Sequence, residues 1–197
     1  ITLGTAWVYE QIESKKIVAN CHKIPAKNFV KKKMGINDII SDFSYVINHL
    51  KNFNPDIKVI FTISPVRHLK DGFIENQWSK STLNVAVHEL LRRYEDVFYF
   101  PSYELIMDDL RDYRFFKSDM VHPSDNAIDY VWEKFSEHYF SKPTIKLSEE
   151  VEQLRKNLQH KPFNPDSAAH KSFENKTEKE MLRLKKNLPH LKLNLTD

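Results

Sequence analysis

An aspartate and a histidine three positions apart are the first residues in this sequence whose types and spacing suggest chemistry. They are Asp119 and His122, in the segment "FFKSDMVHPSD", residues 115–125. Histidine is the most frequent general base at neutral pH, because its unperturbed pKa is about 6.5. A carboxylate that accepts a hydrogen bond from one ring nitrogen orients the ring and stabilises the imidazolium formed in the reaction. The alternative is that Asp119 caps a turn and His122 is a surface residue.

A second group of polar residues follows the most apolar segment of the chain. The segment "SPVRHLKDGFIEN", residues 64–76, contains a guanidinium, an imidazole, a carboxylate and an amide. In open α/β sheets the loops after the strands bind ligands, and arginine suits a carboxylate or phosphate. We therefore expect four residues of this segment to bind substrate, namely Arg67, His68, Asp71 and Asn76. The alternative is that the segment is a solvated loop.

The segment "VANCHK" offers one further candidate. If it is a strand, the adjacent Cys21 and His22 face opposite sides and do not form a catalytic pair. The side-chain amide of Asn20 suits the stabilisation of an oxyanion. Cys21 is the only cysteine, which excludes an internal disulfide and a thiolate-rich zinc site and favours the cytoplasm. We predict no metal and no cofactor.

Length, charge and hydropathy limit the classes of protein. The 197 residues suffice for a domain with a sizeable core. No apolar run of about 18 residues occurs, so we expect no membrane association. The net charge of +3 comes from residues 144–197, with 11 basic and 8 acidic residues, whereas residues 1–143 hold 19 of each. This excess favours a solvated helical face over nucleic-acid binding.

Apolar spacing predicts alternating strands and helices. The uninterrupted run "IKVIFTISP", residues 57–65, is typical of a strand buried on both faces. Strands are also expected at 1–4 and 97–101, with a hairpin over 6–21. Helices are expected over 35–55, 79–97, 102–110 and 124–140, the last with an inward apolar face formed by Ile128, Val131, Trp132, Phe135 and Tyr139.

This order of elements is typical of a doubly wound α/β sheet. It predicts a domain over residues 1–143, followed by a charged helical extension over residues 144–197 with two helices and a proline-containing connection. The chain starts with Ile1, in the β-prone "ITLG", so we expect a fragment whose upstream residues are missing. The lack of a signal peptide then says little about export.

Several segments together resemble the GSCFA-domain family, a bacterial branch of the SGNH/GDSL-like hydrolases. They are "ITLGTAWVYE", "VANCHKIP", "TISPVRHLKDGFIEN", "YFPSYELIMDDLRDYRFF" and "DMVHPSDNAIDYVWEKF". The similarity covers about residues 1–140, in the order of the family's blocks. The tail segment "HKPFNPDS" is also similar to the region beyond these blocks in some members.

The resemblance implies a flavodoxin-like, three-layer α/β/α fold with a mainly parallel sheet of five strands. It implies a catalytic serine near the end of the first strand, with Asp119 and His122 as its partners. The Gly-Ser-Cys-Phe-Ala segment that would carry this serine is absent, as are the first strands. We therefore expect the nucleophile upstream of Ile1. The chain has "GTAW" where the superfamily has Gly-x-Asn, and Asn20 is the nearest substitute.

The resemblance thus implies an esterase or acyl hydrolase that acts on a small-molecule or carbohydrate ester. The alternatives are a non-catalytic carbohydrate- or partner-binding module that keeps the pocket, and a nucleic-acid or partner-binding role for the basic tail. Made alone, this polypeptide is expected to be inactive and poorly stable, because "ITLG" would have an exposed strand edge. The oligomeric state is not predicted.

Overall fold

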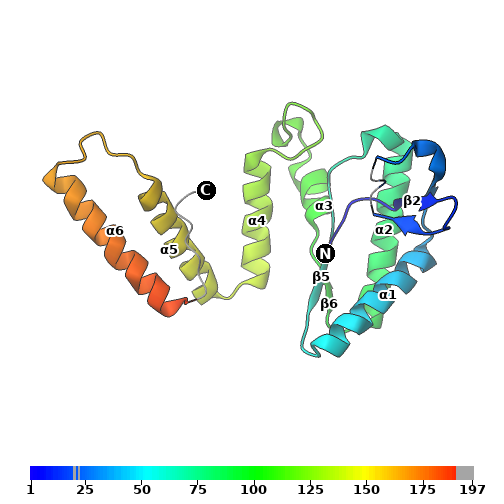
Figure 1. The fold of residues 1–197 in the computed structure, drawn as a ribbon, viewed down its shortest axis with the longest axis horizontal. Coiled ribbons are helices and arrows are strands. Elements are labelled where there is room, and N and C mark those ends of the chain that lie inside the picture. Colours follow the sequence, from blue (N-terminus) through cyan, green and yellow to red (C-terminus); the bar gives the residue numbers. More distant parts are fainter. Residues whose placement is uncertain (20, 22, 190–197) are drawn as a thin grey trace. The chain divides into compact units, whose positions relative to one another are not determined.

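A computed structural model describes residues 1–19, 21 and 23–189 (Figure 1). The chain divides into two compact units, Ile1–Glu133 and Lys134–Asp197. Each unit is described by itself.

A three-stranded parallel sheet lies at the centre of the first unit. Its strands are β1 (Thr2–Leu3), β5 (Val59–Ile63) and β6 (Val97–Tyr99), in the order β1-β5-β6. In the ladder Thr2 is opposite Thr62, and Val59 is opposite Val97. All three strands were predicted from their apolar runs. Because the strands are parallel, the loops that follow them start from one edge of the sheet.

Two helices cover the same face of this sheet. Alternation along β5 places Val59, Phe61 and Ile63 on one side, where all three are buried. They form one core cluster with residues of α1 (Ile36–Phe53) and α2 (Phe73–Arg93), which pack beside the sheet in Figure 1. The mixed α/β character and the mainly parallel sheet are therefore confirmed.

The start of α2 differs from the prediction. We expected residues 64–76 to be a loop and the helix to begin at Ser79, but α2 begins at Phe73. Gly72 precedes the helix with φ +94°, a backbone conformation that residues with a side chain rarely adopt. The buried positions Asn76 and Lys80 already follow the helical spacing that continues through Leu83. Because Asn76 and Lys80 are polar, the apolar periodicity did not extend to the first turns of the helix.

A small antiparallel sheet lies beside these elements, in the order β3-β2-β4. The predicted hairpin is confirmed as β2 (Trp7–Gln11) paired with β3 (Ile17–Val18). The third strand, β4 (Phe29–Lys33), was not predicted, because three successive lysines obscure its alternation. Its pairing with β2 places Lys31 over the ring of Trp7, 5.1 Å from the centroid.

After β6 the backbone follows an irregular helical path. α3 (Ser102–Glu104) continues into a π-helix (Leu105–Leu110), where one short helix was predicted. Arg111 ends it with φ +48°. A 3-10 turn (Tyr113–Phe115) leads to the loop that carries Asp119 and His122. π-Helical turns occur frequently at functional sites.

α4 (Asp125–Tyr139) follows this loop, as predicted, and Ser124 Oγ accepts a hydrogen bond from Ala127 N at 3.4 Å. The expected inward face is wrong at two positions. Ile128 and Trp132 are 51% and 55% exposed. The apolar periodicity marks these side chains as one stripe of the helix, but it does not show that a neighbouring element covers them.

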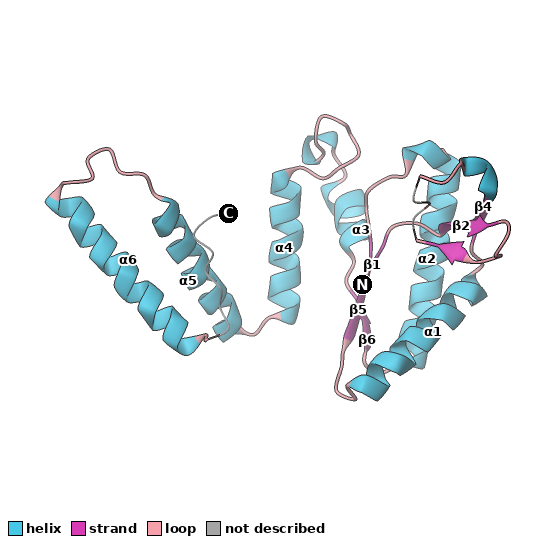
Figure 2. Cartoon of the chain, in the orientation of Figure 1, coloured by secondary structure: helices cyan, strands magenta, loops and turns pink. Residues whose placement is uncertain are grey.

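The second unit contains α5 (Lys142–Gln159) and α6 (Ala168–Asn187), the two charged helices that were predicted (Figure 2). Leu154 and Leu184 are fully buried in this unit, and Arg183 forms an ion pair with Glu150 across the two helices.

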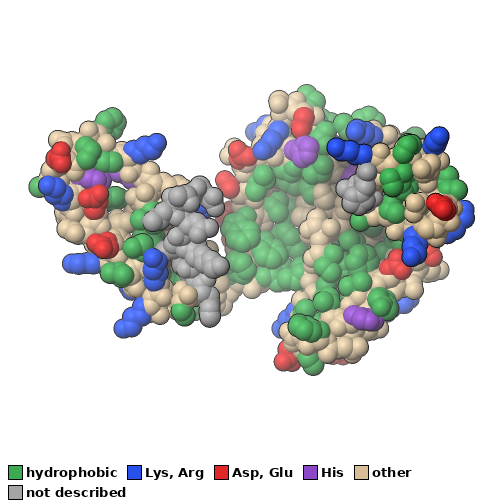
Figure 3. All heavy atoms as spheres, in the orientation of Figure 1, with side chains coloured by type: hydrophobic (Ala, Val, Ile, Leu, Met, Phe, Trp, Pro, Cys, Tyr) green, Lys and Arg blue, Asp and Glu red, His purple; other side chains and the backbone are tan. Residues whose placement is uncertain are grey.

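None of the described helices is long and apolar enough to span a bilayer. Hydrophobic side chains nevertheless occupy much of the surface visible in Figure 3.

Candidate active site

Asp119 and His122 lie on a turn that the backbone closes with hydrogen bonds. Lys117 N donates to His122 O at 2.8 Å, and Ser124 N donates to Phe115 O at 2.8 Å. A bridge between residues 116 and 123 joins the two sides of the turn. Since the ends are fixed in this way, the aspartate and the histidine have little freedom to separate.

The two side chains form a close pair. His122 Nδ1 is 2.6 Å from Asp119 Oδ2. The other carboxylate oxygen, Oδ1, accepts hydrogen bonds from Val121 N at 2.9 Å and His122 N at 3.0 Å. These bonds, first of all the one from His122 N and then the one from its ring, lower the pKa of Asp119 to about 2. The carboxylate is therefore ionised at neutral pH.

This geometry fixes the tautomer of the neutral imidazole. An ionised carboxylate only accepts hydrogen bonds, so His122 Nδ1 must carry the proton that it donates to Asp119. The lone pair of the neutral ring is then on Nε2. The His122 side chain is 59% exposed, so a reactant can reach the ring. A ring oriented in this way is suited to act as a general base.

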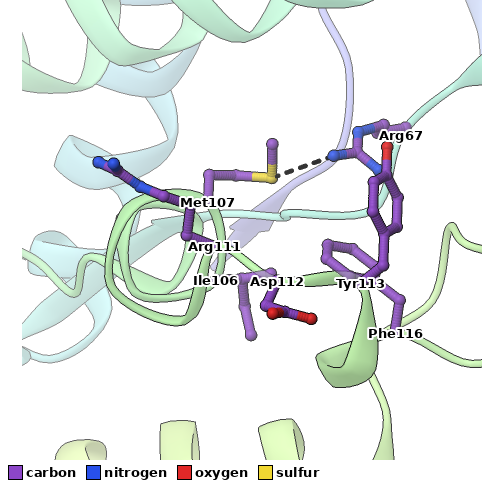
Figure 4. Close-up of a pocket in the computed structure, with 7 residues that line it drawn as sticks. All are labelled: Arg67, Ile106, Met107, Arg111, Asp112, Tyr113 and Phe116. Carbon is purple, nitrogen blue, oxygen red and sulfur yellow. Dashed lines mark hydrogen bonds between the residues drawn. The ribbon is translucent and has the colours of Figure 1, made fainter.

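Arg67 connects the loop after β5 to this turn. Its Nη1 donates to Met120 O at 3.2 Å, and its Nη2 lies 3.9 Å from Met107 Sδ (Figure 4). The guanidinium also lies over two aromatic rings, 5.9 Å from the centroid of Tyr113 and 5.1 Å from that of Phe116. Through Arg67, the Asp119–His122 turn is held at the edge of the sheet where β5 ends.

The other residues of the loop after β5 make contacts within the first unit. His68 N donates to the side-chain oxygen of Asn76 at 2.9 Å, and Asn76 is buried. Asp71 forms an ion pair with Lys31 of β4. Burial, followed by the charge of Lys80, lowers the pKa of His68. The substrate-binding roles expected for His68, Asp71 and Asn76 therefore stay predictions.

Asn20 and Ser64 are two further polar residues of the chain. Asn20, the expected oxyanion donor, lies outside the described residues. Ser64 Oγ accepts a hydrogen bond from Val66 N at 3.2 Å. This bond belongs to the local turn after β5.

Sequence reasoning missed Lys80, which is only 2% exposed. Its ammonium donates to Gly4 O and Ser64 O, each at 2.6 Å, and so joins the carboxyl ends of β1 and β5. Burial lowers its pKa to about 8. The signal was present in the sequence, because Lys80 lies three positions before Leu83 on the apolar stripe of α2. A lysine at such a position is rarely buried without a partner.

Comparison with known protein families places this geometry in context. Residues 1–135 match the GSCFA family. The matched range includes the parallel sheet, α1, α2 and the Asp119–His122 turn. The chain belongs to the GSCFA family. The C-terminal domain of GSCFA domain proteins matches residues 151–196, in the second unit. No curated protein and no solved structure matches the chain.

The GSCFA membership confirms the family named by the sequence resemblance. It also assigns both described units to recognised GSCFA regions, one with the Asp119–His122 pair and one with α6. Within the part of this GSCFA chain that the structure describes, no three His, Cys, Asp or Glu side chains are grouped so that they could hold a metal ion.

Proposed function

We propose that this GSCFA protein is an ester hydrolase of the SGNH type, with a flavodoxin-like sheet and Ser-His-Asp chemistry. Its expected substrates are small-molecule or carbohydrate esters. One observation carries the proposal, which is the 2.6 Å contact between His122 Nδ1 and an Asp119 carboxylate of pKa about 2. Such a pair leaves an oriented general base beside the loops that follow a parallel sheet, where ligands of open α/β folds bind.

In the first half of the reaction, His122 Nε2 takes the proton of a serine hydroxyl while the serine oxygen attacks the ester carbonyl. Asp119 stabilises the resulting imidazolium. The imidazolium then gives its proton to the leaving alcohol, and an acyl-enzyme remains. In the second half, His122 takes a proton from water, the hydroxide attacks the acyl group, and the proton returns to the serine as the acid leaves.

The proposed nucleophile is a serine in a segment that precedes Ile1. In the described part of the chain, no hydroxyl or thiol forms a hydrogen bond with the ring of His122. β1 has a partner strand on one side only, β5, within the described sheet. A preceding strand that pairs with the other side of β1 would end at the same edge as β5, close to the Asp119–His122 turn.

The same lack of a described nucleophile favours an alternative function. A non-catalytic carbohydrate- or partner-binding module would keep the pocket and the Asp119–His122 pair without hydrolysis. The two functions differ in one respect that can be measured, because only the hydrolase needs the lone pair on His122 Nε2.

The test is the hydrolysis of acetylated sugars and of 4-nitrophenyl acetate by the full-length protein. His122→Gln should lower kcat by a factor of about 100 or more, because it removes the general base. His49→Gln is the matched control, since the ring of His49 lies outside the candidate site and hydrogen bonds to a backbone carbonyl of α1, that of Tyr45. Full activity of His122→Gln would disprove the hydrolase mechanism. Binding without turnover by wild type would identify the module.

The chain that begins at Ile1 provides a second comparison. Produced alone, it should lack esterase activity, because the proposed serine is not part of it. Activity equal to that of the full-length protein, abolished by Ser64→Ala, would place the nucleophile at Ser64 instead.

A further inference from the structure

We propose that the cavity beside Arg67 is an anion-binding subsite, so that the substrate is an ester with a carboxylate or phosphate group. This inference rests on the proposed function, because it names the class of substrate for the same site. It depends on three observations: the contacts of the guanidinium, the composition of the cavity, and the connection of Arg67 to the Asp119–His122 turn.

Arg67 has no carboxylate partner among the described residues. Its guanidinium has five N–H donors, and the described protein acceptors are one carbonyl oxygen, that of Met120, and one thioether sulfur, that of Met107. Arg67 is half-buried. A guanidinium that is partly removed from water gains most from a charged, bidentate acceptor. The unused donors of Arg67 are therefore suited to an oxyanion.

The cavity that Arg67 lines has a volume of about 200 Å³. Pockets that enclose whole ligands have volumes of roughly 300–1,000 Å³, so this cavity is large enough for only one group of a larger molecule. Met107, Tyr113 and Phe116 provide apolar walls (Figure 4). Water is partly excluded beside these walls, which strengthens the attraction between the guanidinium and an anion.

The other charged groups of the cavity do not neutralise Arg67. Asp112 accepts a hydrogen bond from Arg114 N at 2.8 Å and lies 3.8 Å from the Arg114 side chain. Arg111 also lines the cavity, but its guanidinium points away from Arg67 in Figure 4, and its Nε donates to Asp108 O. The excess of positive charge remains at Arg67, which is the group that would hold the anion.

Arg67 also determines where the anion would lie relative to the reaction. The guanidinium that faces the cavity donates to the carbonyl oxygen of Met120, between Asp119 and His122. An anion bound to its free N–H groups would therefore lie next to the turn that carries the general base. A substrate held in this way would be an acidic compound with an acyl ester near the charge, such as an acylated uronic acid or sugar phosphate.

Binding tests this inference without any requirement for activity. Glucuronate, glucose 6-phosphate and glucose would each be titrated into the full-length protein by calorimetry. The two anions should bind and glucose should not, and the tighter anion identifies the carboxylate or the phosphate as the ligand. Arg67→Gln should weaken anion binding by a factor of about 10 to 100, as expected for a lost charge-assisted hydrogen bond. Arg67→Lys should fall between wild type and Arg67→Gln.

The matched control is Arg92→Gln, which removes the same charge from an exposed arginine that pairs with Glu89 on α2. It should bind both anions as wild type does. Equal binding of glucose and glucuronate would overturn the inference. So would unchanged anion binding by Arg67→Gln, or a lack of binding by all three sugars.

Kinetics separate this inference from the proposed function. Acetyl esters of methyl glucuronoside and methyl glucoside differ only at C6, which is a carboxylate in the first and a hydroxymethyl group in the second. Arg67→Gln removes the contact of Arg67 with Met120 whichever ester is bound, so kcat/KM should fall for both esters. For the acidic ester it should fall about tenfold or more further, because the anion also loses its partner. Equal hydrolysis of both esters by wild type would reject the anion subsite and keep the esterase. Anion binding without hydrolysis of either ester would reject the esterase and keep the subsite.

Discussion

Arg67 Nη1 donates to the carbonyl oxygen of Met120 at 3.2 Å, across 53 positions of the sequence. Met120 itself has φ +57°, a left-handed conformation that is unusual for a residue with a side chain. Met120, which directly follows Asp119, is thus held in a strained backbone conformation, and Arg67 is one of the groups that hold it. Strain of this kind is concentrated at functional sites.

The strain at Met120 can be tested by two substitutions of opposite effect. Met120→Gly should keep the free energy of unfolding within about 1 kcal/mol of wild type, because glycine adopts positive φ readily. Met120→Val should be destabilising and should lower esterase activity about tenfold or more, because a β-branched residue rarely adopts this conformation. Denaturant unfolding and initial rates measure both effects. Similar behaviour of the two variants would show that the left-handed turn is not required.

The pKa of Asp119 provides a second prediction. A carboxyl carbon titration by NMR should give a midpoint of about 2, below the ordinary value of 3.8. In His122→Ala the pKa should rise but remain below 3.8, because the two backbone N–H groups still donate to Oδ1. A complete return to the ordinary value in His122→Ala would show that the ring alone causes the shift.

The sign of the stability effect follows from this pKa. Because the folded state lowers the pKa of Asp119, its contribution to stability is present above about pH 4. It is lost as the pH falls through about 2. Asp119→Asn should remove this pH dependence, and unfolding measured between pH 2 and 5 would detect the difference from wild type.

Lys80 predicts a pH dependence in the alkaline range. Burial lowers its pKa from 10.5 to about 8, so the folded state loses this proton before the unfolded state does. Between these values the unfolded state binds more protons, and stability therefore rises with pH. The shift corresponds to at most about 3 kcal/mol. A neutral amine still has two N–H groups for the carbonyl oxygens of Gly4 and Ser64.

The comparison for Lys80 is the free energy of unfolding of wild type and Lys80→Met at several pH values. Lys80→Met leaves two carbonyl oxygens without their donor and should be less stable at every pH. The difference between the two proteins should grow from pH 8 to 10. A difference that stays constant would contradict the lowered pKa.

Apolar periodicity predicted most elements that form the core. The strand at residues 57–65 was found because its side chains are apolar at consecutive positions, and α1 because its apolar residues recur at helical spacing. β4 was missed because three successive lysines show no alternation of apolar and polar residues. In the folded chain Lys31 and Lys32 form ion pairs with Asp71 and Glu10, which are distant in the sequence. Such long-range pairs are not visible in a local pattern.

The candidate site was predicted in part for the same reason. The separation of three positions from Asp119 to His122 was sufficient to predict that the two side chains can meet, because the spacing is local. The contact of Arg67 with Met120 joins two loops through the fold, and the π-helix before Arg111 has no simple sequence signal. The buried ammonium of Lys80 depends on two strand ends that come together only in the sheet.

Covalent labelling of the full-length protein tests the proposed hydrolase most directly. A fluorophosphonate reacts with serine hydroxyls that a neighbouring base activates, and mass spectrometry locates the modified residue. We predict one labelled serine in the segment before Ile1, with labelling lost in His122→Gln and kept in His49→Gln. A label within residues 1–197, or equal labelling of His122→Gln and wild type, would contradict the proposal that His122 activates an upstream serine.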